Sequence, residues 1–216
     1  MLKKPTLILA TTLATSLVAA DVSAQSPVQV SIGRGTNVGS FVTFGPTVTC
    51  PDGTEGTAFG QGFVFASDSL TVNTGSRPTR TNGVSIEIFG YSDSCGTNIG
   101  FGSGGFANGY TPPRLNLKSA AIAGTTTVQD FDSGAVYPVS VNLVFTGDGP
   151  LSITKAGDVT HDAGTCTVTI QRDASTSRDA TVMGTLTING AEPDAVYSST
   201  TLNGNSDTTI QIQKKN

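Results

Sequence analysis

The fold class is decided by the stretch Val139-Ser140-Val141-Asn142-Leu143-Val144-Phe145, in which an apolar residue stands at every second position. Successive side chains of a β-strand point to opposite faces, so a period of two indicates a strand with one face on a core. The same alternation occurs in residues 28–32, 84–88, 182–188 and 210–212. Each of these segments is therefore predicted to be a strand.

Turn sequences lie between the alternating segments, and residues that favour helices are scarce. The pattern predicts an all-β fold, a two-sheet antiparallel sandwich of the jelly-roll or immunoglobulin-like type, with a barrel as the alternative. We expect a single domain over residues 25–216, with Thr111-Pro112-Pro113 as the candidate internal boundary. The turn sequences are Pro51-Asp52-Gly53, Asn82-Gly83, Gly147-Asp148-Gly149-Pro150, Asn189-Gly190 and Asn203-Gly204.

The first 24 residues have the form of a signal peptide. Lys3 and Lys4 precede an apolar run over residues 7–20, and Val22-Ser23-Ala24 places small residues before a cleavage site at Gln25. The run is shorter and richer in hydroxyl side chains than a transmembrane helix requires, so no transmembrane segment is expected. We expect the mature chain to be secreted or extracytoplasmic, in the periplasm, at the cell surface or outside the cell.

The charge balance is acidic. The chain carries 12 Lys and Arg against 16 Asp and Glu, a net charge of −4, and its basic residues are scattered along the sequence. Nucleic-acid binding depends on a basic face that displaces counterions from phosphates. We therefore expect no nucleic-acid partner.

The three cysteines predict one disulfide, since an oxidising compartment favours such bonds. Cys50 precedes the turn Pro51-Asp52-Gly53, and Cys95 lies in the turn-like stretch Ser92-Asp93-Ser94-Cys95-Gly96. Cysteines at strand ends beside turns favour a Cys50–Cys95 bond. Cys166 starts an alternation with Val168 and Ile170, so we expect it to be a buried free thiol in the core. A disulfide that involves Cys166 is the alternative.

Two segments of the C-terminal half carry a resemblance. The strand and turn over residues 128–151 end in Phe145-Thr146-Gly147-Asp148-Gly149, an aromatic-Thr-Gly-x-Gly turn, and Arg178-Asp179-Ala180-Thr181-Val182-Met183-Gly184-Thr185 matches Arg-x-Ala-Thr-x-x-Gly-Thr. In both, the chain resembles a family of uncharacterised secreted bacterial all-β proteins, many of which have Trp at the position of Phe145. The resemblance implies secretion and an all-β fold, and it supplies no activity and no site residues.

Catalytic constellations are difficult to assemble from this composition. His161 is the single histidine, in a polar stretch over residues 158–164 that we expect to be a solvated loop. A catalytic histidine needs a nucleophile and an orienting group around it, and structural zinc needs about four Cys or His ligands. We expect a protein without catalytic residues. A hydrolase with a carboxylate pair is an alternative, although no feature of the sequence links Glu55, Glu87 and Glu192.

Asp130 and Asp132 are the candidate metal ligands. They share a strand face, and together with Asp148, or with the loop acids Asp158 and Asp162, they would offer oxygen ligands to Ca²⁺. A solvated edge or turn is the simpler interpretation, because Ca²⁺ requires more ligands than one Asp-x-Asp provides. No other cofactor is expected. Glycan binding is a further alternative, but the chain has no Trp and its four Tyr are dispersed.

The stretch over residues 59–106 is rich in Gly and Phe and has two interpretations. Phe59, Phe63 and Phe65 share one strand face, whereas Gly60 and Gly62 leave the other face bare. A bare face would accept another strand, a glycan or a neighbouring subunit. Alternatively, the glycines allow two parts of the fold to approach closely, which is the more common role of glycine in strands.

The function that we expect is a secreted, non-catalytic role in structure, in a surface or matrix, or in assembly. A glycan- or calcium-binding module and a hydrolase are the alternatives. Self-association is predicted from the end segments 28–32 and 209–213, which lack the Pro or inward charge that blunts a sheet edge. If either is an edge, it can pair with another chain; otherwise both pair within their own fold. The identity of the partner and the oligomeric state do not follow from the sequence.

Overall fold

Strands make up most of the chain that the structure describes. The computed structural model describes residues 28–213, and within this range it contains twelve strands and no helix, which confirms the all-β expectation. The expected signal peptide, residues 1–24, lies outside the described residues. The strands are β1 (Val28–Thr49), β2 (Glu55–Asn73), β3 (Thr79–Asp93), β4 (Asn98–Ile99), β5 (Gly102–Ala107), β6 (Tyr110–Thr111), β7 (Ser119–Asp130), β8 (Val136–Gly147), β9 (Ser152–Asp162), β10 (Thr167–Ile188), β11 (Glu192–Tyr197) and β12 (Thr200–Gln213).

All pairings between these strands are antiparallel, as expected, and they join the strands into one 12-stranded sheet. The order of neighbours is β11-β1-β12-β10-β8-β7-β5-β3-β2, and β9, β4 and β6 pair with β10, β3 and β7. Because β2 also pairs with β1, the hydrogen-bonded neighbours form a closed ring.

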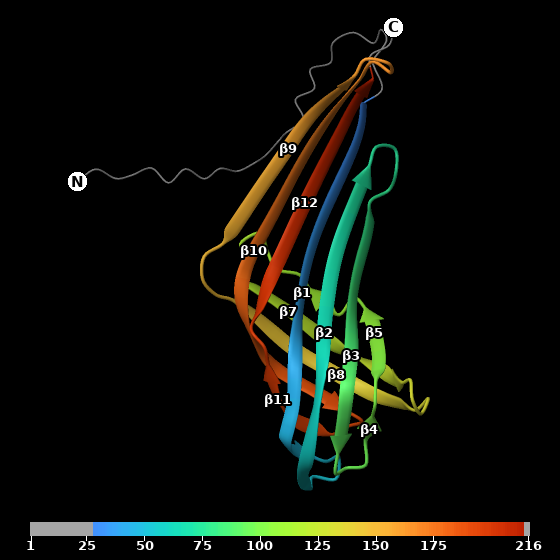
Figure 1. Ribbon diagram of the computed structural model, residues 1–216, viewed down its shortest axis with the longest axis vertical. Helices are drawn as coiled ribbons and strands as arrows, with labels where there is room; N and C mark the ends of the chain where they lie inside the picture. Colours follow the sequence, from blue (N-terminus) through green and yellow to red (C-terminus); the bar gives the residue numbers. More distant parts are fainter. Residues whose placement is uncertain (1–27, 214–216) are drawn as a thin grey trace, which may run out of the picture.

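Two parts of different thickness share the longest strands. β1 and β10 contain 22 residues each and β2 contains 19, against about five or six in a common strand. At one end, which we call the compact end, β7 and β8 cross the long strands; at the other, β9, β10, β12, β1, β2 and β3 continue alone (Figure 1). We call this second part the extension. It comprises residues 28–37, 67–83, 152–178 and 203–213.

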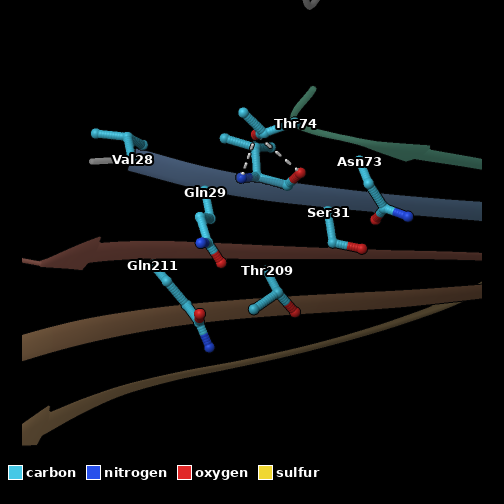
Figure 2. Close-up of a pocket in the computed structure, with 8 residues that line it drawn as sticks. Val28, Gln29, Ser31, Asn73, Thr74, Thr209 and Gln211 are labelled. Carbon is cyan, nitrogen blue, oxygen red and sulfur yellow. Dashed lines mark hydrogen bonds between the residues drawn. The ribbon is translucent and has the colours of Figure 1, made fainter. Parts of the chain in front are cut away.

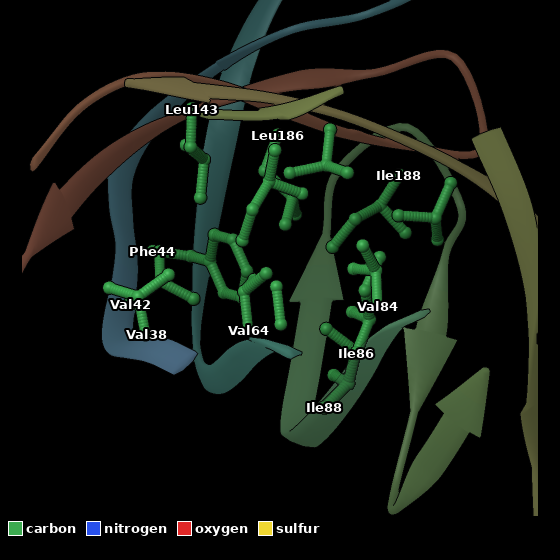
Figure 3. Packing of buried hydrophobic residues seen from close by; sticks show 14 of the residues in the cluster. Val38, Val42, Phe44, Val64, Val84, Ile86, Ile88, Leu143, Leu186 and Ile188 are labelled. Atoms are coloured by element: carbon green, nitrogen blue, oxygen red, sulfur yellow. The ribbon is translucent and has the colours of Figure 1, made fainter. Parts of the chain in front are cut away.

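The core lies entirely in the compact end. Figure 3 shows Leu143 and Leu186 pointing toward Phe44 and Val64 on the facing strands. These are the alternating apolar residues of the sequence, and full burial of each such side chain stabilises the fold by about 1.5–3 kcal/mol. The alternation at residues 139–145 holds as predicted, since Val139, Val141, Leu143 and Phe145 are all buried.

Glycines bring strands close together at two places. Gly184 of β10 has a φ of 144°, and a Cβ there would overlap the Asn142 carbonyl oxygen of β8. In the Gly- and Phe-rich stretch, a Cβ at Gly104 of β5 would overlap the Thr127 carbonyl oxygen of β7. The interpretation that glycine in this stretch permits close approach is therefore confirmed at Gly104.

The predicted disulfide is present. Cys50 follows β1 and Cys95 lies between β3 and β4, and their sulfur atoms are 2.01 Å apart with Cα atoms 5.6 Å apart. The alternative pairing with Cys166 is therefore wrong. The bond links two turns at the compact end, 45 residues apart in the sequence.

Cys166 differs from its predicted place. It lies half-buried in the turn between β9 and β10 with a φ of 51°, and its Sγ donates to the Ala163 carbonyl at 3.8 Å. The expectation of a core thiol at the start of a strand is wrong. The strand begins one residue later, at Thr167, and the extension offers no second layer under which a side chain could be buried.

Candidate functional site

The extension is a single layer of sheet. None of its residues belongs to the buried core, which ends at one level across the long strands, at Val38, Ala66, Val84, Ala180 and Leu202. Beyond that level every described side chain is exposed or only half-buried. A sheet in a folded domain normally has at least one face covered by another element. The extension is an exception, and both of its faces are open to its surroundings.

Register sorts the side chains of the extension onto two faces of opposite character. Residues directly opposite one another in neighbouring strands share a face. One face continues the side that carries the core, and we call it the inner face. Its apolar members come from β1, β2, β9, β10 and β12. At the edge of the sheet, Ile153 and Val159 of β9 are each 54% exposed. The apolar members of the inner face are Val28, Val30, Ile32, Leu70, Val72, Ile153, Val159, Val168, Ile170, Ile210 and Ile212.

The opposite side, the outer face, is polar. Figure 2 shows Gln29, Ser31, Thr209 and Gln211 side by side at the tip of the extension, where Gln29 stands opposite Gln211 and Ser31 opposite Thr209. Nearby, Thr74 closes the β2–β3 hairpin onto β1, since its Oγ1 accepts the Val30 N–H at 2.7 Å. Hydroxyl and amide side chains of this kind are suited to contact with water.

Charges are divided between the two faces by sign. In the described strands of the extension, Arg34, Arg80, Lys155 and Arg172 lie on the inner face. The inner-face acid, Asp68, is paired with Arg80, whose Nε lies 2.8 Å from the Asp68 Oδ1. The outer face carries the other acids, namely Asp158, Asp162, Asp173 and Asp207. The inner face is thus apolar and cationic, and the outer face is polar and anionic.

The segment between β6 and β7 lies at the base of the inner face. Leu117 of this segment is buried beside Gly204 of β12, and its backbone meets Gly147 next to the Arg178 side chain. Arg178 stands opposite Leu202 on the inner side, and its Nε is buried without a hydrogen-bond partner in the described structure. Leu115, two residues before Leu117, is 94% exposed.

The two end segments that were predicted as open edges are not edges of the sheet. Residues 28–32 pair with β12, and residues 209–213 lie between β1 and β10, so neither end segment is an edge. The alternative, that both pair within their own fold, is correct, because β1 and β12, the first and last described strands, pair with each other. The stretch around His161, expected to be a solvated loop, is instead the end of β9. Within residues 28–213, β9 pairs with β10 alone and is an open edge.

Asp130 and Asp132 do come together, beside Gly100. The buried Asp130 carboxylate accepts the backbone N–H groups of Gly100 and Ser133, both at 3.1 Å, and the Ser133 hydroxyl. A Cβ on Gly100 would overlap the Asp132 carboxylate. Asp148, Asp158 and Asp162 belong to other parts of the fold. Within residues 28–213, no group of three or more His, Cys, Asp or Glu side chains gathers closely enough to hold a metal ion.

The hydrogen bonds to Asp130 predict an acid-sensitive turn. The Ser133 hydroxyl, chiefly, holds the pKa of Asp130 below its ordinary value. A carboxyl with a lowered pKa in the folded state stabilises the fold above its unfolded pKa of about 3.9, and this contribution is lost as the pH falls through the lowered value. Urea unfolding at pH 7, 5 and 3 should therefore show a steeper loss of stability below pH 5 in the wild type than in Asp130→Asn. Asp132→Asn is the matched control and should follow the wild type; parallel curves for all three would contradict the prediction.

The glutamates considered for a hydrolase are linked by register, which the sequence does not reveal. Glu55 of β2 and Glu192 of β11 stand on either side of Thr49, whose hydroxyl donates to Glu55 at 3.2 Å. Neighbouring strands are about 4.8 Å apart, so the two backbones are about 10 Å apart. Both side chains are exposed on the sheet surface, and Glu87 lies apart from them, opposite Phe63.

An aromatic cluster lies beside Asp132. Phe89, Phe101 and Phe131 are all exposed, with ring centroids 5.8 Å apart for the first pair and 5.5 Å apart for the second. The cluster does not follow from the sequence, because platforms were expected from Trp and Tyr and the three rings come from separate parts of the chain, namely β3 and two connections. The tyrosines are poor platforms; Tyr110, for example, belongs to the core, and its burial raises its pKa to about 12.

Comparisons with known proteins leave the chain without an assigned family. No family model and no curated protein matches it. Among solved structures, a Nitrosomonas europaea protein described as a candidate AttH superposes with a TM-score of 0.26 at 11% sequence identity. The match covers 83% of this chain and 52% of that chain, so this chain spans about half the length of that protein. A TM-score of this size carries no argument about fold or function. In the described part of the chain, no helix has the length and apolarity needed to cross a membrane.

Proposed function

We propose that this protein is a secreted or extracytoplasmic, non-catalytic protein that acts in structure or at a surface, and that its working part is the extension. One observation carries the proposal: the inner face is apolar and has no second layer over it. Exposed apolar areas larger than a few hundred Å² are sites of interaction in most soluble proteins. The Cys50–Cys95 disulfide is compatible with an oxidising compartment.

The two parts of the molecule have separate tasks in this proposal. The compact end is a stable base with a filled core and a disulfide. The extension projects from this base and makes contact with a partner. A partner on this face would protect it, because uncovered apolar surface promotes aggregation.

The proposal is tested by polar substitution on the inner face. Val30, Ile170 and Ile210 stand in neighbouring strands there, and threonine is β-branched like Val and Ile and has a similar preference for strands. We expect Val30→Thr, Ile170→Thr and Ile210→Thr together to lower the fraction of exported protein that sediments with the cell envelope or matrix by at least tenfold. The physical reason is that burying each Val or Ile contributes about 1.5–3 kcal/mol. The measurement is quantitative blotting of the pellet and the supernatant.

A matched control uses the outer face of the same strands. Ser31→Thr, Thr169→Ser and Thr209→Ser change three side chains on β1, β10 and β12 without altering the inner face. This variant should be retained like the wild type. Far-ultraviolet circular dichroism must show the same strand content for all three proteins. Equal retention of the wild type and the inner-face variant would overturn the proposal.

The second candidate is a glycan- or calcium-binding module at the compact end. The observation in its favour is that the exposed Phe89–Phe101–Phe131 cluster adjoins Asp132. Against calcium, the Asp130 oxygens are already occupied by donors from Gly100 and Ser133. A rise of the melting temperature with Ca²⁺ that disappears in Asp132→Asn, or glycan binding that disappears in Phe101→Ala, would favour this candidate over the extension. The hydrolase alternative would need glycan turnover that depends on Glu55 and Glu192.

A further inference from the structure

We infer that the inner face of the extension binds the surface of an anionic lipid membrane. In this arrangement its apolar side chains lie against acyl chains, and its arginines and lysine lie at the headgroup phosphates. The inference rests on the proposed function, because it names the partner of the same surface. It is carried by the combination of apolar and cationic side chains on one face of a single sheet layer.

The apolar side chains are distributed as an interfacial surface requires. They run across five neighbouring strands, from Val72 on β2 to Val159 on β9, and they are densest toward the tip, where Val28, Ile212 and Val168 share one row. Extended backbone advances about 3.3 Å per residue, so the ten residues from Val28 to Asn37 span about 30 Å. Membrane-surface elements bury one apolar face at the boundary of headgroups and acyl chains in this way.

The cationic side chains lie where headgroup phosphates would meet the sheet. Arg172 is two strand positions from Ile170, and Arg34 is two positions from Ile32, so both follow the apolar rows toward the base. Lys155 stands opposite Ala174 in the same region. Long basic side chains can keep their aliphatic part on an apolar surface while the charge reaches the headgroups. Each Lys or Arg near an anionic membrane strengthens binding by about fivefold.

The base of the inner face adds to the same chemistry. Arg178 has a buried Nε without a hydrogen-bond partner in the described structure, and a buried donor of this kind is costly unless a ligand accepts from it. The neighbouring segment exposes Leu115 between Arg114 and Lys118. Apolar and basic side chains are thus adjacent here too. A phosphate with an attached acyl chain matches both.

A second copy of the chain matches this face less well. In a two-fold stack of inner faces, Arg34, Lys155 and Arg172 of both copies would share one interface. Asp68, the acid that the described strands place on this face, is already paired with Arg80. Buried charges without counter-charges are destabilising. Stacking the inner face on the acidic outer face of another copy would satisfy the charges, but it would bury apolar side chains against Thr, Ser and Gln and leave those groups without water.

The test measures flotation of the exported protein with vesicles of phosphatidylglycerol and phosphatidylcholine, and with vesicles of phosphatidylcholine alone. We expect binding to the anionic vesicles that weakens with salt. Arg34→Gln, Lys155→Gln and Arg172→Gln together should reduce the partition coefficient about a hundredfold. The control Asp158→Asn, Asp173→Asn and Asp207→Asn changes three charges on the outer face and should retain binding. Circular dichroism confirms that each variant keeps its strand content.

The possible results separate the inference from the proposed function. Equal binding to both vesicle types, or an unchanged partition of the Arg34, Lys155 and Arg172 variant, would overturn the inference of an anionic membrane. No vesicle binding, with self-association by light scattering that the Val30, Ile170 and Ile210 variant abolishes, would overturn it in favour of a second copy and leave the proposed function standing. No vesicle binding, no self-association and unchanged envelope retention of that variant would overturn both.

Discussion

Replacing Ile86 with alanine should reduce the free energy of unfolding by about 2–5 kcal/mol, the range for a fully buried isoleucine that leaves a cavity. Ile86 is completely buried, between Val64 of β2 and Gly104 of β5 and under the facing layer of the compact end. The neighbouring strands are fixed by their own pairings, so they cannot collapse to fill the space. Urea unfolding of the wild type and the variant, followed by circular dichroism, measures the difference.

The same substitution in the extension should cost far less. Ile170→Ala removes an identical group from an interior strand, between Val159 of β9 and Ile210 of β12, but there is no second layer under which a cavity could form. We expect a loss of about 1 kcal/mol or less, because a thin region can also open locally without unfolding the core. Equal losses for Ile86→Ala and Ile170→Ala would contradict the description of the extension as a single layer.

Removing the disulfide should have an effect of similar size. For the loop of 45 residues between Cys50 and Cys95, the chain-entropy model predicts that the bond stabilises the fold by about 4 kcal/mol. The Cys50→Ser and Cys95→Ser double variant should therefore melt at a temperature lower by roughly 8–16 °C, given about 2–4 °C per kcal/mol for a chain of this size. Differential scanning calorimetry measures the shift.

Cys166→Ser is the control for this experiment. Cys166 lies outside the disulfide, in the turn between β9 and β10, so its substitution should change the melting temperature by only a few degrees. Chemical reduction of the disulfide in the wild type should lower the melting temperature by the same amount as the double substitution does. If the double variant had the same melting temperature as the wild type, the bond would not stabilise the fold by constraining the unfolded chain.

Local patterns in the sequence determined the strands of the compact end. Val139 to Phe145 and Val84 to Ile88 alternate with a period of two, and their apolar residues are buried in the structure as predicted. The Cys50–Cys95 bond followed from two cysteines beside turns. These predictions succeeded because pleat and turn chemistry are local properties, which a few adjacent residues specify.

Strand β9 and the convergence of Asp130, Asp132 and the phenylalanine cluster were not predictable in the same way. Residues 152–162 contain Gly157 and several polar residues, so they lack the apolar alternation of a strand that covers a core. They form a strand because β10 offers a long edge to pair with, as its register with β9 shows. Phe89 lies near the end of β3, whereas Phe101 and Phe131 lie in connections beside β5 and β7, and only the pairing of these strands brings the three rings together.

The residue pattern is therefore enough to predict an antiparallel β protein with alternating faces and a Cys50–Cys95 disulfide. It could not distinguish Val30, Ile170 and Ile210, which are uncovered, from Val141, Ile86 and Leu186, which are buried, because both sets have the same period of two. Which rows acquire a second layer depends on where β7 and β8 cross the long strands (Figure 1), and that crossing is set by contacts between residues far apart in the chain. That one apolar, cationic face is left open is visible only in the assembled fold, since burial is a property of the packed layers and not of any single strand.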